Sequence, residues 1–237
     1  MAQNTTQAVM QSRHEAPDSL DDFPTPPWAT RAAIEIVKDR FDGWIGKQVV
    51  REPCANRGHM VRPLAESFRK VVASDVHEYG SGYPLVDYLF PAAMERADWV
   101  FMNPPFNLGA DFIHKSFETP GWNGTAALVR TSFLEGQGRY RELFSVRPPT
   151  MIAQFVERVI MHKGCLRDPD ALYWDGTQWK KPSTATSYCW LLWVRGVPPQ
   201  PFHWIAPCRK RLERPGDYPT ATRAACSTKQ PGFSLLE

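Results

Sequence analysis

The residues whose types point most directly to chemistry are Asn103, Pro104, Pro105 and Phe106, which follow the apolar run at 98–102. An amino group on a ring is a poor nucleophile because its lone pair is delocalised into the ring. The Asn103 side-chain oxygen and the Pro104 carbonyl can each accept one N–H bond and free that lone pair, and the prolines hold the carbonyl in place. Phe106 offers a flat face for stacking. Because Asn is not a general base, this tetrapeptide predicts polarisation of a planar amino group.

A second candidate site is the segment EPCANRG at 52–58, between an expected strand and an expected helix. Such a turn exposes backbone N–H groups and needs small residues where a ligand comes close. Gly58 is its one glycine, and Asn56 stands where another glycine is expected; Asn tolerates positive φ better than most residues. The candidate ligand contacts in this turn are Glu52, Pro53, Cys54, Ala55 and Gly58.

Acidic residues follow the next apolar run. Asp75 ends the run VVASD, 17 residues after Gly58, near the spacing of about 20 at which an acid binds the ribose diol of a cofactor. Asp87, followed by Tyr88, could accept from the adenine amino group of the same cofactor. Upstream, the segment 22–28 could close over a bound cofactor. Its candidate contacts are Phe23, Thr25, Pro26 and Trp28.

In this order, the segments make the chain from Asp22 to Val194 resemble the S-adenosylmethionine (SAM)-dependent amino-methyltransferases of the adenine-N6 DNA type, particularly small phage or prophage members. Residues 103–106 are similar to the family's (D/N)PP(Y/F/W) catalytic motif. The turn at 52–58 resembles its SAM-binding turn. The cofactor motifs precede the catalytic motif, which resembles the gamma arrangement, in which target recognition follows the catalytic motif.

The resemblance also implies roles for single residues. Asp75 matches the acid on the SAM ribose, Asp87 and Tyr88 lie where the SAM adenine binds, and 23–28 is similar to the motif around the methionine part. Asn103 is expected to contact both cofactor and acceptor. The resemblance thus implies SAM as cofactor, DNA as partner and methyl transfer to N6 of an adenine flipped out of the duplex.

Several alternatives stay open. A ribosomal RNA amino-methyltransferase or a protein-glutamine methyltransferase also needs to polarise a planar NH2 group, and an inactive nucleic-acid-binding relative would keep the fold. Cys54 follows a proline, as the nucleophile of cytosine-C5 methyltransferases does, but here 103–105 follow the catalytic strand. We therefore interpret Cys54 as a packing residue.

The elements expected to position these residues alternate between strands and helices, which predicts an α/β fold with a mainly parallel sheet covered on both faces. The resemblance implies a Rossmann-like sheet of the seven-stranded type. The last two strands could pair antiparallel at one edge. We expect strands at 48–52, 71–75, 98–103, 125–131, 152–161 and 187–194, and helices at 30–41, 60–70, 110–117 and 140–144.

We expect a disordered arm at 1–20, one methyltransferase domain at 21–197 and an irregular basic tail at 198–237. From Arg195 onward there are seven Lys or Arg residues against three acids, although the whole chain carries only +3. No independent target-recognition domain is visible, so segment 162–186, which is polar but contains Tyr173, Trp174 and Trp179, is the candidate target-recognition loop. Arg130, Arg139, Arg141 and the tail could hold phosphates.

Other features limit the class of protein. The five cysteines are odd in number and lack C-x-x-C spacing, so neither a disulfide framework nor a metal site is expected. No signal peptide and no apolar run of about 18 residues is present in the sequence, so no membrane span is expected. The reducing cytoplasm of a bacterial or phage-infected cell is the expected location.

Overall fold

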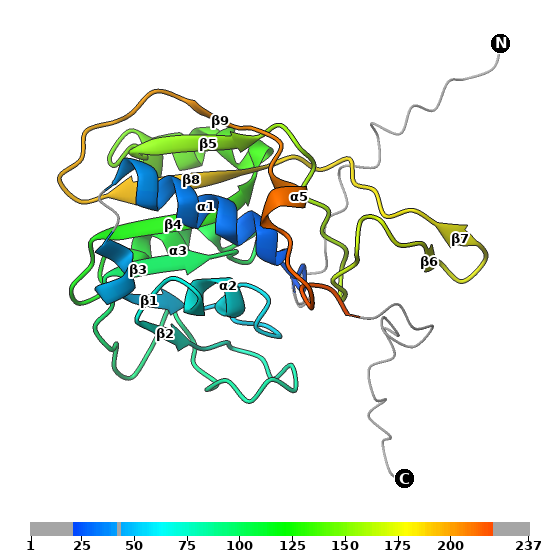
Figure 1. Cartoon of the computed structure of the whole chain (residues 1–237). Helices are drawn as coiled ribbons and strands as arrows, with labels where there is room; N and C mark the ends of the chain where they lie inside the picture. The colour runs from blue at the N-terminus through cyan, green and yellow to red at the C-terminus, as the bar shows by residue number, and fades with distance from the viewer. Residues whose placement is uncertain (1–20, 42–43, 220–237) are drawn as a thin grey trace, which may run out of the picture.

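The structure is a computed structural model that describes residues 21–41 and 44–219. Its centre is a seven-stranded sheet whose strands are parallel except β8, which runs antiparallel to both neighbours (Figure 1). Across the sheet lie β2 (Lys70–Ala73), β1 (Val49–Glu52), β3 (Trp99–Met102), β4 (Gly124–Arg130), β8 (Tyr188–Val194), β5 (Met151–Phe155) and β9 (His203–Ile205).

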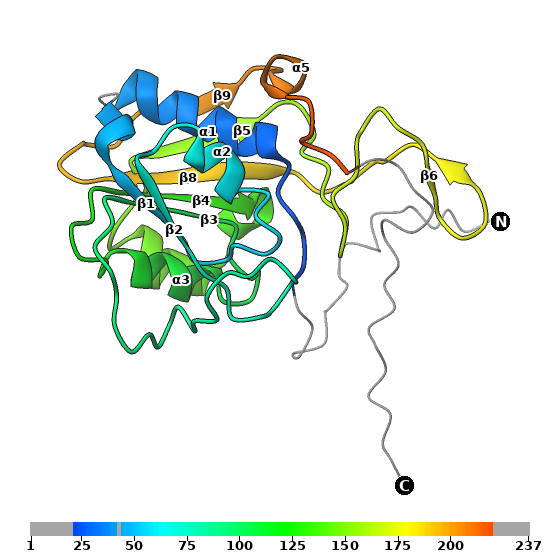
Figure 2. The same cartoon turned by 60° about the horizontal axis from the view of Figure 1, so that its bottom comes forward.

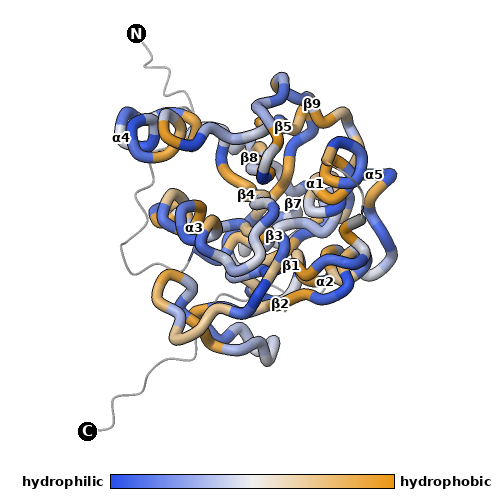
Figure 3. Tube along the Cα trace, turned by 90° about the vertical axis from the view of Figure 1, so that its left-hand side faces the viewer, coloured by the Kyte–Doolittle hydropathy of each residue, from blue (hydrophilic) through white to orange (hydrophobic). Residues whose placement is uncertain are grey.

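Helices cover both faces of the sheet. Figure 3 looks along the strands and shows α1, α2 and α5 on one side and α3 and α4 on the other; Figure 2 shows the same layers. The helices are α1 (Pro27–Arg40), α2 (Val61–Ala65), α3 (Gly109–Ser116), α4 (Gln137–Arg139) and α5 (Arg209–Leu212), with a π-helical turn at Tyr140–Phe144 and 3-10 turns at Trp44–Lys47 and Thr131–Leu134. The predicted mainly parallel α/β fold is confirmed.

Each face of the sheet has its own hydrophobic core, because successive residues of a strand point to opposite faces. In β3, Phe101 packs in the core that contains Trp190, with ring centroids 6.0 Å apart. Val100 and Met102 belong to the other core, with Ile113 of α3. All four residues of β3 are buried, which explains the unbroken apolar run before the predicted catalytic motif.

Several predicted bounds differ from the structure. The helix predicted at 30–41 begins at Pro27, because proline suits a first helical turn whose N–H groups have no intrahelical partner. The helix predicted at 60–70 ends at Ala65, since β2 already begins at Lys70. The strand predicted at 152–161 ends at Phe155.

The predicted antiparallel pairing of the last two strands is confirmed, but the predicted place at the edge is wrong. β8 pairs with β4 on one side and β5 on the other, and β9 forms the edge. The prediction of an irregular tail is therefore wrong for its first part. β9 extends the sheet beside β5, and Ile205, Cys208 and Leu212 are buried in the core on the α1 side.

The end of the described C-terminal segment is fixed to α1 by a buried ion pair. The Arg31 guanidinium, 6% exposed, donates to Asp217 at 2.7 and 2.9 Å and to Glu66 at 2.8 and 2.9 Å. It also donates to the Leu212 carbonyl at 2.7 Å. Because these partners lie up to 186 positions apart, the chain closes back on its first helix.

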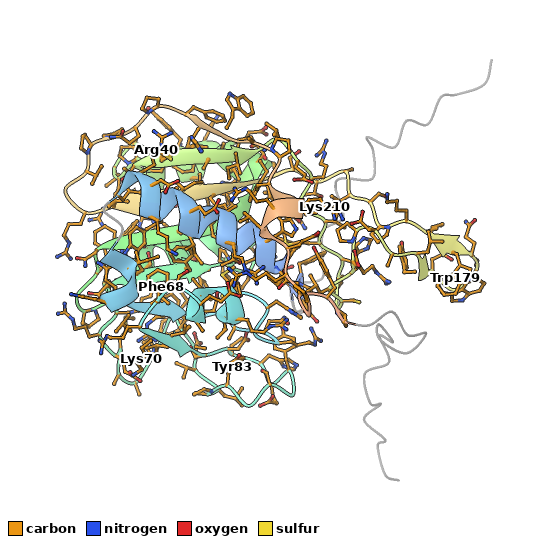
Figure 4. The ribbon with its side chains drawn as sticks, in the orientation of Figure 1. Arg40, Phe68, Lys70, Tyr83, Trp179 and Lys210 are labelled. Atoms are coloured by element: carbon orange, nitrogen blue, oxygen red, sulfur yellow. The ribbon has the colours of Figure 1, made fainter. Side chains whose placement is uncertain are left out.

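The basic residues of this segment form ion pairs with nearby acids. Lys210, labelled in Figure 4, pairs with Asp170. Hydrogen bonds from Arg209 and Lys210 hold the pKa of Asp170 well below its usual range. The other pairs join Arg209 to Glu157, Asp170 and Glu213, Arg211 to Glu35, and Arg214 to Glu66. Binding of phosphates by these four residues would have to replace these ion pairs, and the phosphate-binding role stays a prediction.

The candidate target-recognition segment 162–186 contains a small hairpin of β6 (Tyr173–Trp174) and β7 (Trp179–Lys180). The hairpin projects from the body of the molecule, with Trp179 near its end (Figures 1 and 4). The Trp174 and Trp179 ring centroids lie 5.8 Å apart. The segment is tied to the domain where the Gly164 N–H donates to the Asp22 carbonyl at 2.7 Å.

Of the cysteines, Cys54, Cys189 and Cys208 are free, whereas Cys165 is disulfide-bonded, which the spacing did not predict. Within 21–41 and 44–219, no helix is long and apolar enough to cross a membrane. Within the same ranges, no cluster of three or more His, Cys, Asp or Glu residues could hold a metal ion. The predicted arm at 1–20 and residues 220–237 of the predicted tail lie outside the described residues.

Candidate active site

A cavity of about 400 Å³ lies at the carboxyl ends of β1, β2 and β3, where ligands of open α/β sheets bind. Its volume suits a drug-sized or cofactor-sized ligand. Four stretches far apart in sequence line it. They are Asp21 and Phe23–Thr25; Pro53–Asn56, His59 and Met60; Asp75, Val76, Tyr79 and Val86–Phe90; and Asn103, Pro105, Leu108 and Phe112.

The turn after β1 has the backbone conformation that its sequence predicts. Asn56 has φ 49° and Gly58 has φ 79°, both in the left-handed region that Asn and Gly tolerate best. A Cβ atom on Gly58 would lie 2.4 Å from the Tyr83 hydroxyl oxygen. Gly58 is therefore needed for its backbone conformation, and a larger residue would also displace the Tyr83 side chain; Gly58 does not itself line the cavity.

Two acids of the site differ in their surroundings. Asp75 is 8% exposed, and its oxygens accept the Asn56 N–H at 2.8 Å and the His77 N–H at 3.0 Å. Burial raises the pKa of Asp75 above its usual value, and these bonds oppose the rise. Asp87 is exposed at the cavity rim and accepts the Leu89 N–H at 3.0 Å. Asp75 thus fixes the turn while also facing the ligand space.

Glu52 is fully buried behind this turn, not on the cavity wall. Burial raises its pKa well above the usual range, and one oxygen accepts the Cys54 N–H at 2.9 Å. Burial also raises the pKa of the Cys54 thiol well above its usual value. A thiol that stays protonated is a weak nucleophile, which agrees with the interpretation of Cys54 as a packing residue.

The segment 21–25 joins the turn after β1 to the predicted catalytic motif. The Asp22 carboxylate accepts from the Arg57 guanidinium at 3.0 Å and from the Asn56 amide at 2.8 Å. Asp21 accepts the Phe106 N–H at 2.6 Å. The segment therefore fixes the cavity wall from two sides at once.

His59 lines the cavity as a neutral side chain. Burial and the charges of Arg62 and Arg57 lower the pKa of His59 to about 4, while Asp22 opposes the shift. The Arg62 guanidinium lies 2.9 Å from the His59 ring nitrogen Nδ1. Because the ring is uncharged at pH 7, it adds no positive charge to the ligand space.

Asn103 directly follows β3, and its amide has a defined orientation. Its Nδ2 donates to the Phe23 carbonyl at 2.9 Å; a reversed amide would place two oxygens against each other. Its Oδ1 is buried and has no hydrogen-bond partner among the described residues. Within 21–41 and 44–219, no donor bonds to the neighbouring Pro104 carbonyl either. A buried acceptor without a partner costs free energy unless a ligand donates to it.

Phe106 lies between this cavity and a smaller one of about 180 Å³. Pro105 lines both cavities, and Phe106 and Pro104 line the smaller one. The Phe106 ring centroid is 5.3 Å from that of Phe23 and 3.6 Å from the guanidinium carbon of Arg130. The tetrapeptide therefore separates a large cavity from a small, arginine-lined one.

The structure brings together most of the predicted contacts on the large cavity, namely Phe23, Thr25, Pro53, Cys54, Ala55, Asp75, Asp87, Tyr88, Asn103 and Pro105. Others are not on its wall. Trp28 is fully buried, with its ring edge-on to Phe155 at 5.4 Å, and Pro26 is the N-cap of α1. These two residues position segment 21–25 instead of facing the ligand space.

Sequence reasoning missed several residues on the cavity wall. Tyr79 lies between the predicted motifs, and the Arg57 guanidinium stacks 5.0 Å from its ring centroid. Leu108 is the N-cap of α3 and Phe112 lies within it. Their spacing of four residues places both on one face of the helix. That spacing was the available signal for α3; none marked Tyr79.

No protein-family profile matches this sequence, and no curated protein is significantly similar to it. Solved structures with the same fold include a candidate RNA methyltransferase from Pyrococcus horikoshii (16% identity, 78% of this chain and 95% of that one, TM-score 0.51). A candidate class I SAM-dependent methyltransferase from Listeria monocytogenes matches at 9% identity (84% and 69%, TM-score 0.52). The methyltransferase subunit of a type I restriction-modification system from Streptococcus thermophilus matches at 11% identity (88% and 52%, TM-score 0.51). The fold is thus Rossmann-like, that of class I methyltransferases.

Proposed function

We propose that this chain transfers a methyl group from SAM to the exocyclic amino nitrogen N6 of adenine in DNA. The observation that carries the proposal concerns the Asn103 Oδ1 atom, next in the chain to the Pro104 carbonyl. This atom is buried and has no hydrogen-bond partner within 21–41 and 44–219. An amino group that donates one N–H bond to each acceptor is drawn towards tetrahedral geometry. Its lone pair then becomes available for attack, with the acceptors already in position.

The large cavity fits SAM by its volume and by its groups. Asp75 would accept from the ribose hydroxyls through the lone pairs that its backbone bonds leave free. Asp87 would accept from the adenine amino group, and Tyr88 and Phe112 would provide apolar contacts to the adenine ring. When bound, SAM would supply an electrophilic methyl group on a sulfonium sulfur. As the N–C bond forms, the C–S bond breaks and S-adenosylhomocysteine leaves, and the methylated nitrogen releases one proton to water.

The chain's own residues would orient the acceptor. The smaller cavity, bounded by Pro104, Pro105 and Phe106, would hold the ring of the target base. Its amino group would extend past Pro104 towards Asn103, which lines the larger cavity. A base paired in a duplex cannot enter such a cavity, so the target would be flipped out. Arg130 and Arg139 line the smaller cavity, whereas Arg141 lines a separate open hollow with Tyr140. The first two are therefore the better candidates for contacts near the acceptor.

The test is incubation of the full chain with methyl-labelled SAM and separate pools of DNA, RNA and protein, followed by mass spectrometry of the digested products. We expect N6-methyladenine in DNA, and an Asn103→Ala chain run in parallel should remove it. Label in RNA adenine would redirect the proposal to an RNA methyltransferase. Label only in protein, or 5-methylcytosine in DNA, would overturn it. N4-methylcytosine would keep the mechanism and change the base.

A further inference from the structure

Arg130, the last residue of β4, covers one face of the Phe106 ring. Its guanidinium carbon lies 3.6 Å from the Phe106 ring centroid and 5.8 Å from that of Phe23. This separation equals that of two planar groups in van der Waals contact. A second ring between Arg130 and Phe106 would need about twice that distance, so this face of Phe106 is closed.

Arg130 and Phe106 both line the smaller cavity. Under the proposed function, the acceptor base stacks on Phe106 in this cavity. The base and the guanidinium compete for the same position. Arg130 must therefore leave Phe106 before an acceptor can bind there.

Few hydrogen bonds oppose such a displacement, because the Arg130 guanidinium bonds to the Tyr188 hydroxyl but not through every one of its nitrogens. Its Nε atom is buried and has no hydrogen-bond partner among the described residues. A guanidinium binds phosphate through parallel N–H bonds, which are stronger than a cation–π contact at a partly exposed site. Arg139, in the same cavity, is different. Its guanidinium donates to the carbonyls of Phe133 and Glu135 at 2.5–3.0 Å, which fixes it in place.

We propose that Arg130 is a specificity-determining residue that admits only acceptors carrying a phosphate. The phosphate of the target nucleotide draws the guanidinium away and uncovers the ring face on which the base stacks. This inference rests on the proposed function, and it defines the acceptor as a nucleotide rather than a free base, a nucleoside or a protein amide.

The experiment compares 2′-deoxyadenosine with its 5′-monophosphate for binding, by calorimetry, and for methylation. The full chain and the variants Arg130→Ala, Arg130→Lys and Arg147→Ala are compared. Arg147 is the matched control, since its guanidinium also stacks on an aromatic ring, 4.3 Å from the Phe117 centroid. The unchanged chain should prefer the monophosphate at least tenfold. Arg130→Ala should bring that preference close to one, by binding the nucleoside more tightly and the monophosphate more weakly.

Arg130→Lys keeps the positive charge but lacks the planar guanidinium with its parallel N–H donors. Its preference for the monophosphate should therefore lie between those of the unchanged chain and Arg130→Ala. Arg147→Ala should keep the original preference. Equal preference in the unchanged chain, or the same preference in Arg130→Ala and Arg147→Ala, would overturn the inference. Should Arg130→Ala fail to fold, the ratio in Arg130→Lys decides. Binding is measured without methyl transfer, so a chain that binds selectively but methylates no nucleic acid would refute the proposed function alone.

Discussion

At the scale of single residues, the proposed reaction depends on two acceptors, the Asn103 Oδ1 atom and the Pro104 carbonyl, to which no donor among the described residues bonds. The Phe23 carbonyl orients the Asn103 amide, so the Asn103 oxygen has a fixed position, buried and without a hydrogen-bond partner among the described residues. That carbonyl belongs to segment 21–25, which Asp22 fixes to Asn56 and Arg57. A change in this segment would thus act on the acceptor through the orientation of one amide.

Asn103→Ala should lower the rate of methyl transfer on the order of a hundredfold or more, because one of two fixed acceptors is lost. Binding of SAM should change little, since the other three stretches of the cavity wall remain. The measurement is single-turnover methylation together with calorimetry of SAM binding. Asn123→Ala is the matched control, because Asn123 lies in the loop between α3 and β4 and its amide contacts Asp98 instead of the cavity. An Asn103→Ala chain with normal turnover would remove Asn103 from the mechanism.

His59 predicts a pH dependence of stability. Its pKa of about 4 in the folded chain lies below the usual 6.5. As pH falls below 6.5, the unfolded chain takes up a proton that the folded chain does not, so stability falls until about pH 4. In urea unfolding, His59→Gln should lose less stability than the unchanged chain between pH 7 and 4, by on the order of 1–3 kcal/mol. Identical losses in both chains would contradict the neutral assignment of His59.

At the scale of elements, the sequence predicted the buried strands best. The sequences of β3, β4 and β8 are continuously apolar because both faces of the sheet are covered there, and such a run predicts a buried strand. The predicted bounds of α1 and α2 differ from the structure, since a proline sets the start of α1 and the nearby strand β2 limits α2. β9 was missed because three residues in a proline-rich stretch carry no periodicity, and its place beside β5 depends on long-range contacts.

Elements also explain which site residues could be predicted. Motifs directly after a strand, such as 52–58 and 103–106, are placed by the sheet, so their position follows from strand order. Trp28 lies within α1, and the sequence did not define how α1 is oriented on the sheet. In the structure the Trp28 side chain packs in the core. Tyr79 lies in a long connection without regular structure, where no pattern indicates direction.

The C-terminal segment predicts a stability effect far from the cavity. Asp217→Asn should destabilise the chain by roughly 3 kcal/mol, because it removes a buried partner of the Arg31 guanidinium. Glu95→Gln is the control, since both side chains of its pair with Lys70 are exposed, and such a pair is worth about 1 kcal/mol or less. Thermal or urea unfolding checks both. Equal effects would mean that closure of the chain onto α1 contributes little.

At the scale of the whole molecule, the cavity wall comes from four separated stretches that the sheet brings together. In the proposed reaction, SAM and the target base would occupy two neighbouring cavities on the same edge of the sheet, separated by residues 104–106. The projecting β6–β7 hairpin lies at that end of the molecule in Figures 1 and 2, where, under the proposed function, it would contact nucleic acid around the target base. Trp174 and Trp179 are its candidate stacking residues.

A ligand that contacts all four stretches should stabilise the whole chain, because only the folded state holds them together. At a hundred times its Kd, SAM should add about 2.7 kcal/mol to the free energy of unfolding, or about 5–10 °C in Tm for a domain of this size. Asp87→Asn should reduce this shift at a fixed SAM concentration, since it weakens one contact at the rim without altering the buried turn. Asp39→Asn, an exposed acid near the end of α1, should leave the shift unchanged. S-adenosylhomocysteine should produce a comparable shift, because it keeps the groups that Asp75 and Asp87 would bind. A Tm that does not respond to either compound would mean that the large cavity holds a different ligand, even with Asn103 placed as it is.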